Sequence, residues 1–415
     1  MNYKFTKLNI LFTIVILFYS SCANDKAAPI NGKWRATIDT KGGPMPFILE
    51  FENNADSSTI TAYAINASER LELDTLIFEN DSITIPISLF DAKIVAKLEG
   101  KKMTGRWERY IGSEKYIGSK FNAEMGISER FLTNNSSKFE NVEGKWATDF
   151  VTADGKYKTE AVGVFKQVGQ KVTGTFLTTT GDYRYLEGLM DGDSLKLSTF
   201  DGTHLYLFKA KKTGTKLRGQ FWSNINSLEN WEATLDPKAA LPDLNKLTFL
   251  KPGFNKIEFE FPTVGSGNKL NINDKSLENK VKIIQLMGTW CPNCMDETRY
   301  LAPWYDKNKS RGVEIIGLSY EKSTEMAESG PKIQKMIDRF GIHYPVLLAG
   351  SKNAGEAAKS LPMLNTVLGF PTTIVIDKKG VVRNIHTGFS GPGTGQYYTE
   401  WVAEFNDLMD KLLAE

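Results

Sequence analysis

The chain has 415 residues, with 51 lysines and arginines against 49 aspartates and glutamates, so its formal net charge is +2. A balance this close to zero gives no sign of a nucleic-acid partner. Hydrophobic residues make up 41% and charged residues 24%, which excludes a disordered or fibrous chain. At roughly 100–200 residues per domain, the length predicts two to four domains.

The first 22 residues have the pattern of an export signal. Lys4 and Lys7 precede an apolar run from Leu8 to Tyr19, which is shorter than the about 20 residues that a helical membrane span requires. Two serines then lead to Cys22, and this ending resembles a bacterial lipoprotein signal, in which the cysteine is lipidated. We predict a lipoprotein signal peptide at 1–22, lipidation of Cys22, and a membrane-anchored chain that faces the periplasm or the outer surface. The alternatives are an ordinary signal peptide with an incidental cysteine, or an uncleaved anchor.

A sequence repeat follows the signal. Four landmarks recur in the same order about 112 residues further along, which indicates a duplication. The matched segments are Gly32-Lys33-Trp34 with Gly144-Lys145-Trp146, Asp81-Ser82 with Asp193-Ser194, and Gly100–Trp107 with Gly214–Trp222. Short alternating runs separated by turn residues are typical of antiparallel β-structure. We predict two β-rich repeats at 30–127 and 140–236, each a small barrel or sandwich, which act as a spacer or bind a ligand or partner.

The character of the sequence changes after a proline-containing linker at 237–253. From 254 to 415, strand and helix signals alternate, which predicts an α/β domain. The predicted strands are Lys282–Met287, Val313–Ser319, Thr372–Asp377 and Val381–Ile385. The predicted helices run from about Met295 to Asn308, with a kink or interruption at Pro303, from Lys332 to Phe340, and along the C-terminus.

The first of these strands runs into Trp290-Cys291-Pro292-Asn293-Cys294. Cys291 falls at or just before a helix start, where free amide groups and the helix dipole favour a thiolate. One helical turn brings Cys294 within bonding distance. We therefore expect Cys291 to be the nucleophile that attacks a partner disulfide, and Cys294 to be the resolving thiol that displaces the mixed disulfide.

These residues resemble the TlpA/ResA-like thioredoxin-fold thiol-disulfide oxidoreductases of the bacterial envelope. The Trp-Cys-Pro-Asn-Cys segment matches the thioredoxin active site, and Phe370-Pro371-Thr372-Thr373 matches the family's cis-proline before a strand. The resemblance implies a thioredoxin-like domain at 254–415 and a redox-active disulfide between Cys291 and Cys294. It also implies substrate contacts from Trp290, Phe370, Pro371 and Thr372.

Glu297 resembles the family's acid/base carboxylate, which would move a proton to or from Cys294. The alternative is an exposed glutamate that favours the helix dipole. Gln285 stands where cytosolic thioredoxins carry a buried aspartate, and this departure places more weight on Glu297.

The predicted function is an envelope protein-disulfide reductase. The expected partners are disulfide-containing envelope proteins as substrates, an upstream membrane electron donor, and the membrane through the N-terminal lipid. No cofactor, metal or nucleic acid is expected; a copper site that joins His386 to the two cysteines is a minor possibility. Two alternatives stay open: a redox-responsive ligand- or partner-binding lipoprotein with a structural or sensing CxxC, and a thiol peroxidase.

Overall fold

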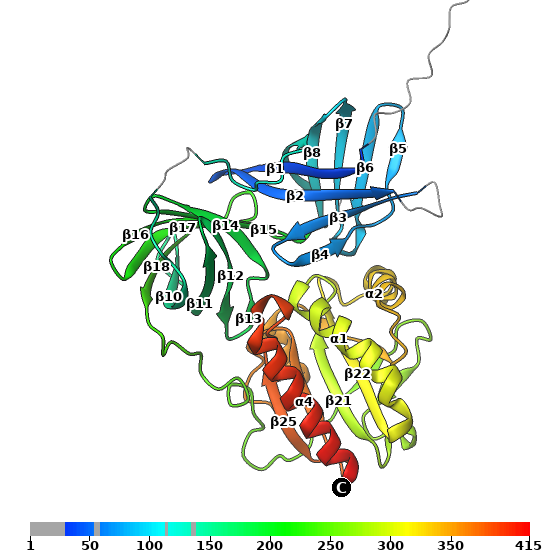
Figure 1. The fold of residues 1–415 in the computed structure, drawn as a ribbon. Coiled ribbons are helices and arrows are strands. Elements are labelled where there is room, and N and C mark those ends of the chain that lie inside the picture. The colour runs from blue at the N-terminus through cyan, green and yellow to red at the C-terminus, as the bar shows by residue number, and fades with distance from the viewer. Residues whose placement is uncertain (1–29, 54–58, 113–114, 134–137) are drawn as a thin grey trace, which may run out of the picture.

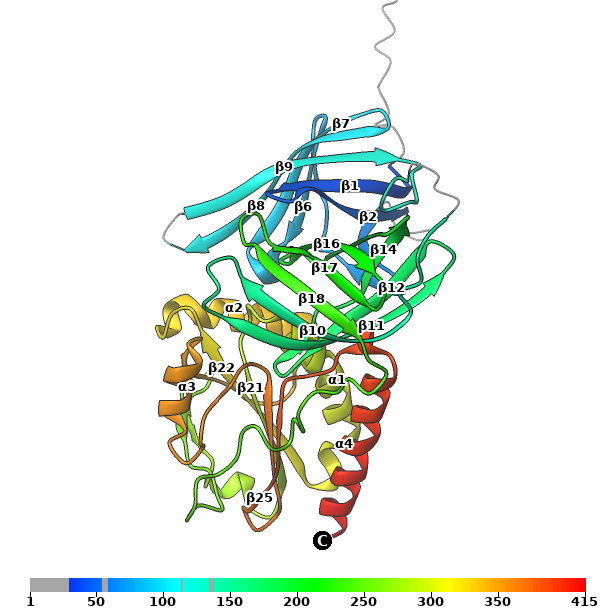
Figure 2. The same cartoon turned by 90° about the vertical axis from the view of Figure 1, so that its left-hand side faces the viewer.

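The computed structural model describes residues 30–53, 59–112, 115–133 and 138–415 (Figure 1). The predicted signal at 1–22, with Cys22, lies outside the described residues. Of the helices that are described, none is long and apolar enough to cross a membrane. Two β-domains lie together over one end of a C-terminal α/β domain (Figures 1 and 2).

The first β-domain is a nine-stranded antiparallel meander in which β1 also pairs with β9. Its curled sheet ends at two edges, formed by β4 and β5. The strands are β1 (Gly32–Thr40), β2 (Gly43–Asn53), β3 (Ile60–Asn66), β4 (Glu69–Glu72), β5 (Ile77–Glu79), β6 (Ser82–Ile87), β7 (Ala92–Glu99), β8 (Lys102–Gly112) and β9 (Lys115–Met125), with the short helix η1 (Ser88–Phe90) after β6.

The second β-domain repeats this strand order and closes. Here β11 also pairs with β12, so that eight strands form an antiparallel barrel, and the short β13 pairs with the end of β12. The strands are β10 (Gly144–Thr152), β11 (Lys158–Val168), β12 (Lys171–Thr178), β13 (Gly181–Asp182), β14 (Leu186–Asp191), β15 (Ser194–Phe200), β16 (Leu205–Thr213), β17 (Lys216–Ser223) and β18 (Glu229–Leu235).

The duplicated sequence makes the same contact in both copies. Trp34 and Trp146 are fully buried near the start of β1 and β10. The indole Nε1 of Trp34 donates to Ile30 O at 2.7 Å, and that of Trp146 donates to Val142 O at 2.9 Å. Each indole therefore ties the segment before its domain's first strand to that domain's core.

The α/β domain is built on a five-stranded sheet of order β23-β22-β21-β24-β25. β21, β22 and β23 are parallel, β24 runs antiparallel to them, and the edge strand β25 runs antiparallel to β24. Its elements are β19 (Glu260–Pro262), β20 (Lys269–Asn271), η2 (Lys275–Leu277), β21 (Val281–Met287), α1 (Pro292–Asn308), η3 (Lys309–Arg311), β22 (Val313–Glu321), α2 (Met326–Phe340), β23 (Val346–Ser351), α3 (Ala354–Ser360), β24 (Thr372–Ile376), β25 (Val382–Thr387), η4 (Pro392–Thr394) and α4 (Gln396–Ala414). Figure 2 shows α4 along one side of this domain and α3 on the other. The predicted fold class, β-rich repeats followed by a thioredoxin-like domain, is confirmed.

Two helices differ from their predicted bounds. Helix α1 begins at Pro292, because a proline at the first helical position loses no intrahelical hydrogen bond, and it continues through Pro303 without interruption. Helix α2 begins at Met326 and includes Pro331, where the prediction starts only at Lys332. The prediction also lacks β23 and α3.

We expect Trp34→Phe and Trp146→Phe each to destabilise their own β-domain by about 1–3 kcal/mol, because each leaves a carbonyl near the core without its donor. Trp107 and Trp231 are matched controls, since both are buried but their Nε1 atoms make no hydrogen bond to any described residue. Differential scanning calorimetry of the four Trp→Phe variants measures the effect. Equal losses for the variant and the control within a domain would contradict a stabilising role of the indole hydrogen bond.

Candidate active site

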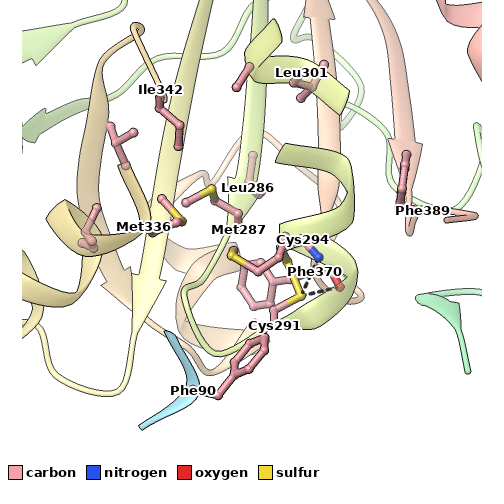
Figure 3. Packing of buried hydrophobic residues seen from close by; sticks show 14 of the residues in the cluster. Phe90, Leu286, Met287, Cys291, Cys294, Leu301, Met336, Ile342, Phe370 and Phe389 are labelled. Carbon is pink, nitrogen blue, oxygen red and sulfur yellow. Dashed lines mark hydrogen bonds between the residues drawn. A yellow bond between two sulfur atoms is a disulfide. The ribbon is translucent and has the colours of Figure 1, made fainter. Parts of the chain in front are cut away.

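The two cysteines meet at the N-terminal end of α1. Cys291 is the N-cap residue of α1, and its Sγ accepts a hydrogen bond of 3.2 Å from Cys294 N. The two residues form a disulfide, with their Cα atoms 5.3 Å apart (Figure 3). The first-turn amides of a helix lack intrahelical acceptors and favour negative charge. A thiolate that forms at Cys291 on reduction is therefore stabilised by its position.

A carboxylate on the neighbouring strand fixes the loop before Cys291. Thr289 donates to Glu321 through both its backbone N and its Oγ1, each at 2.7 Å. Ser319 Oγ also donates to Glu321 at 2.7 Å. Glu321 is buried at the end of β22, which pairs with β21, so its position follows from the sheet. Glu321 was not predicted; its one signal in the sequence is a glutamate at the end of a largely apolar strand.

Trp290, Phe370 and Pro371 lie together beside the disulfide. The Phe370-Pro371 peptide bond is cis. Cys291 Sγ lies 3.6 Å from Phe370 O, and the Phe370 ring packs edge-on against Trp290 at a centroid distance of 5.8 Å. Trp290 Nε1 donates to Tyr320 O at 2.8 Å. These three residues therefore lie beside Cys291, and substrate contact by them stays a prediction.

Thr372 has a different environment from these three residues. It is fully buried at the start of β24, and its Oγ1 donates to Gly369 O at 2.9 Å. This hydrogen bond links the start of β24 to Gly369, the residue before the cis Phe370-Pro371 bond. Direct substrate contact by Thr372 stays a prediction.

Glu297 is fully buried one helical turn beyond Cys294, which excludes the exposed-glutamate alternative. Its Oε1 accepts from Thr373 Oγ1 at 2.5 Å, and its Oε2 accepts from Gln285 Nε2 at 2.8 Å. Burial raises the pKa of Glu297 to about 7, against the smaller opposing effect of these two hydrogen bonds. A carboxyl with a pKa near neutrality can both hold and release a proton at neutral pH.

Both β-domains reach the disulfide. Cys291 is 5% exposed and Cys294 is fully buried. Phe90 of the first β-domain lies next to Cys291 in Figure 3 and lines a pocket together with Pro292. In the second β-domain, Asp182 O accepts a hydrogen bond of 3.3 Å from Asn293 Nδ2, inside the CxxC motif.

A buried arginine joins the three domains beside this site. Arg184, after β13, has 4% of its side chain exposed. Its Nη1 lies 2.5 Å from Asp296 of α1, its Nη2 lies 2.5 Å from Glu69 of β4, and its Nε lies 3.4 Å from Asp201. These four residues were not predicted, because Arg184 lies 112 residues from Asp296 and 115 residues from Glu69 along the chain.

Metal-ligating groups are not gathered here. Among residues 30–53, 59–112, 115–133 and 138–415, no three His, Cys, Asp or Glu side chains are grouped to hold a metal ion. His386 Nδ1 lies 3.0 Å from Asn245 Oδ1. Burial lowers the pKa of His386 to about 4.

A disulfide at a helix start after the central strand, opposite a cis-proline, defines a thioredoxin-like redox domain. The family model described as Redoxin matches residues 242–399, and the match begins inside the predicted linker. The chain is 30% identical over 114 residues to thiol-disulfide oxidoreductase ResA of Halalkalibacterium halodurans, which covers 28% of this chain and 57% of that protein. It is 28% identical over 144 residues to thiol:disulfide interchange protein DsbE of Haemophilus influenzae, which covers 35% of this chain and 69% of that protein.

The chain is also similar to thiol-disulfide oxidoreductase ResA of Bacillus subtilis. The two are 28% identical over 123 residues, which cover 30% of this chain and 60% of that protein. The chain thus spans 57% and 60% of the length of these two ResA proteins. A crystal structure of a thioredoxin-family thiol:disulfide interchange protein from Chlorobium tepidum matches with 24% identity and a TM-score of 0.30, covering 38% of this chain and 95% of that one. The resemblance of the C-terminal domain to TlpA/ResA-like thioredoxin-fold proteins is confirmed by the Redoxin match and the ResA and DsbE relatives.

The raised pKa of Glu297 predicts a pH-dependent stability. Because the folded chain holds this proton up to about pH 7 and the unfolded chain releases it near 4.5, the free energy of unfolding falls as pH rises through that window, by up to about 3 kcal/mol. Glu297→Gln should remove this fall. Urea unfolding of the oxidised chain at pH 5 and pH 8 measures it.

The matched control is Glu404→Gln, which changes an exposed glutamate on α4. This control should keep the wild-type difference between the two pH values. A Glu297→Gln variant with that same difference would show that another group carries it.

Proposed function

We propose that the chain is a thiol-disulfide oxidoreductase of the bacterial cell envelope that reduces disulfides in other envelope proteins. The observation that carries the proposal is the Cys291–Cys294 disulfide at the start of α1, beside the cis Phe370-Pro371 bond. Similarity to proteins named thiol-disulfide oxidoreductase and thiol:disulfide interchange protein supports it.

The cycle transfers two electrons from the dithiol to the substrate disulfide. The Cys291 thiolate attacks one sulfur of that disulfide, so the substrate S–S bond breaks, a mixed disulfide forms and one substrate thiolate leaves. The Cys294 thiolate then attacks Cys291 Sγ. This step forms the Cys291–Cys294 bond, breaks the mixed disulfide and releases the second substrate thiolate, which takes up a proton.

Glu297 has the position and the pKa for proton transfer with Cys294. Residues three apart on a helix are neighbours, about 5–6 Å between Cβ atoms. Ionised Glu297 accepts the proton of the Cys294 thiol as this sulfur becomes the attacking thiolate. Gln285 and Thr373 hold the carboxylate in place by donating to its two oxygens.

The finer features of the proposal rest on the sequence. Residues 1–22 would direct export, and lipidated Cys22 would hold the chain at the membrane, facing the periplasm or the outer surface. An upstream membrane electron donor would reduce the Cys291–Cys294 disulfide after each turnover. The domain bounds 30–127, 140–236, 237–253 and 254–415 belong to the same proposal; the strands of the two β-domains run from 32 to 125 and from 144 to 235.

We expect the wild-type chain to reduce insulin in the presence of a small-thiol reductant, and Cys291→Ser to abolish this turnover because no attacking sulfur remains. Turbidity of precipitating insulin chains measures the rate. Equal rates for wild type and Cys291→Ser would overturn the proposal.

Cys294→Ser is compared with Cys291→Ser to test which cysteine attacks the substrate. It retains the attacking sulfur and lacks the resolving one, so it should accumulate mixed disulfides on Cys291. Non-reducing gels and mass spectrometry detect these adducts, which Cys291→Ser should not form. Adducts that form on Cys294 instead, in Cys291→Ser, would reverse the assigned roles.

Glu297→Gln should slow the resolving step by about 100-fold, because a neutral amide cannot accept the Cys294 proton. The wild-type rate should rise with pH as Glu297 ionises near pH 7, and the variant should lose this rise. Stopped-flow measurement of mixed-disulfide decay between pH 5 and 9 follows both effects. Glu404→Gln serves again as control, and a wild-type pH profile in Glu297→Gln would remove Glu297 from the mechanism.

A further inference from the structure

A turn of the second β-domain lies against the active-site loop. We call residues 178–182 the capping turn; they comprise the last residue of β12, the two-residue turn and the short strand β13. Its Thr180 faces Gly369, where an added Cβ atom would lie 2.7 Å from Thr180 Cγ2. Its Thr179 faces Gly388, where an added Cβ atom would lie 2.9 Å from Thr179 O. The capping turn thus packs on the residues that flank the cis Phe370-Pro371 bond.

Glycine on both sides makes this close approach possible. Gly181 has φ +143°, and an added Cβ atom there would overlap the side-chain amide of Asn293. Across the contact, Gly388 has φ +79°, and its N donates to Pro371 O at 2.8 Å. A side chain at Gly181, Gly369 or Gly388 would push the capping turn away from the cysteine loop.

The place that the capping turn fills is the one that a substrate needs. An extended protein segment binds a thiol-disulfide exchange site by lying along backbone beside the reactive sulfur. Here that backbone is the stretch from Gly369 to Pro371, since Cys291 Sγ lies 3.6 Å from Phe370 O. Asn293, between the two cysteines, is already bonded to Asp182 O. Cys291 itself is only 5% exposed, so the reactive sulfur is nearly covered in this arrangement.

Buried hydrogen bonds hold the capping turn in place. Asp182 is buried, with one carboxylate oxygen 2.7 Å from Gly391 N and the other 2.6 Å from Arg184 N. Arg184, itself at φ +59°, continues the connection to Asp296 of α1 and Glu69 of the first β-domain. Opening would separate Arg184 from Asp296 and Glu69, so these ion pairs exist only in the closed arrangement, and removing one partner would leave the other charge buried and unpaired.

We propose that the capping turn is a built-in occupant of the substrate groove, and that a protein substrate reaches Cys291 only after the turn and its β-domain move away. This inference rests on the proposed function, which assigns the groove to substrate. The structure is the closed form, in which the redox pair is shielded. The Arg184 junction sets how often the chain opens.

The test measures how fast the Cys291–Cys294 disulfide of the oxidised full-length chain is reduced, first by dithiothreitol and then by a protein dithiol, thioredoxin. Gly181→Val and Arg184→Gln should raise the rate with thioredoxin by at least about tenfold, the change that a loss of about 1.4 kcal/mol from the closed form produces. The rate with dithiothreitol should change less, because a small reagent needs a smaller opening. Acid quenching and alkylation of free thiols give both rates.

Matched controls lie on the same β-domain, away from the groove. Gly155→Val changes another glycine with positive φ, one that has open space around it. Arg218→Gln breaks the exposed ion pair with Glu232. Both should reduce at the wild-type rate. If Arg184→Gln fails to fold, as circular dichroism would show, Asp296→Asn weakens the same junction from α1 and should give the same acceleration.

Wild-type rates with thioredoxin in Gly181→Val and in the folded junction variant would overturn the capping proposal. Insulin turnover is scored separately in the same proteins. Faster reduction of the variants without insulin turnover in any chain would refute the proposed function and leave the cap established. Insulin turnover in the wild type, with no faster reduction of the variants, would refute the capping proposal and support the proposed function.

Discussion

A buried cation needs anions around it, and the carboxylates that surround Arg184 come from all three domains. Asp296 comes from α1, Glu69 from the first β-domain and Asp201 from the second. Asp182 lies in the same region, and burial together with the nearby Asp296 raises its pKa to about 6. Carboxylates gathered this closely repel one another, so the guanidinium charge is what makes the junction favourable. This pairing joins the second β-domain to the start of α1, beside the hydrogen bonds of Asp182 with Asn293 and Gly391.

The same docking sets the environment of the redox pair. Phe90 lies next to Cys291, and Asp182 of the capping turn accepts a hydrogen bond from Asn293 within the CxxC motif, so both β-domains border this region. Exclusion of water strengthens the electrostatic effects within that region. The helix start then acts more strongly on Cys291, and Glu297, buried beneath, keeps its proton near neutral pH. The contacts of Glu297 come from Gln285 and Thr373 of the α/β domain itself, whereas the β-domains contribute Phe90 and Asp182 at the cysteine loop.

The sequence predicts the parts whose signals lie within a few residues of one another. The CxxC motif after an apolar strand, the Phe-Pro-Thr-Thr segment and the two tryptophan-marked repeats are of this kind, and the structure contains each of them. The Arg184 junction could not be predicted, because Arg184 and Asp296 lie 112 residues apart and a charged residue beside a β-strand normally faces solvent. Glu297 is an intermediate case: the family resemblance suggested its role, but only packing shows that it is buried.

The capping turn also has a counterpart in the duplication. The repeat offset of 112 residues places the turn between β3 and β4 of the first copy on the turn between β12 and β13 of the second. Both turns lie near the junction: Glu69, the first residue of β4, pairs with Arg184, which lies two residues after β13. In the first copy, Asn66 Nδ2 also donates to Phe200 O of the second β-domain at 2.8 Å. The two equivalent turns therefore make different contacts: Glu69, next to the first, pairs with Arg184, and the second, which precedes Gly181, packs on the residues beside the cis-proline.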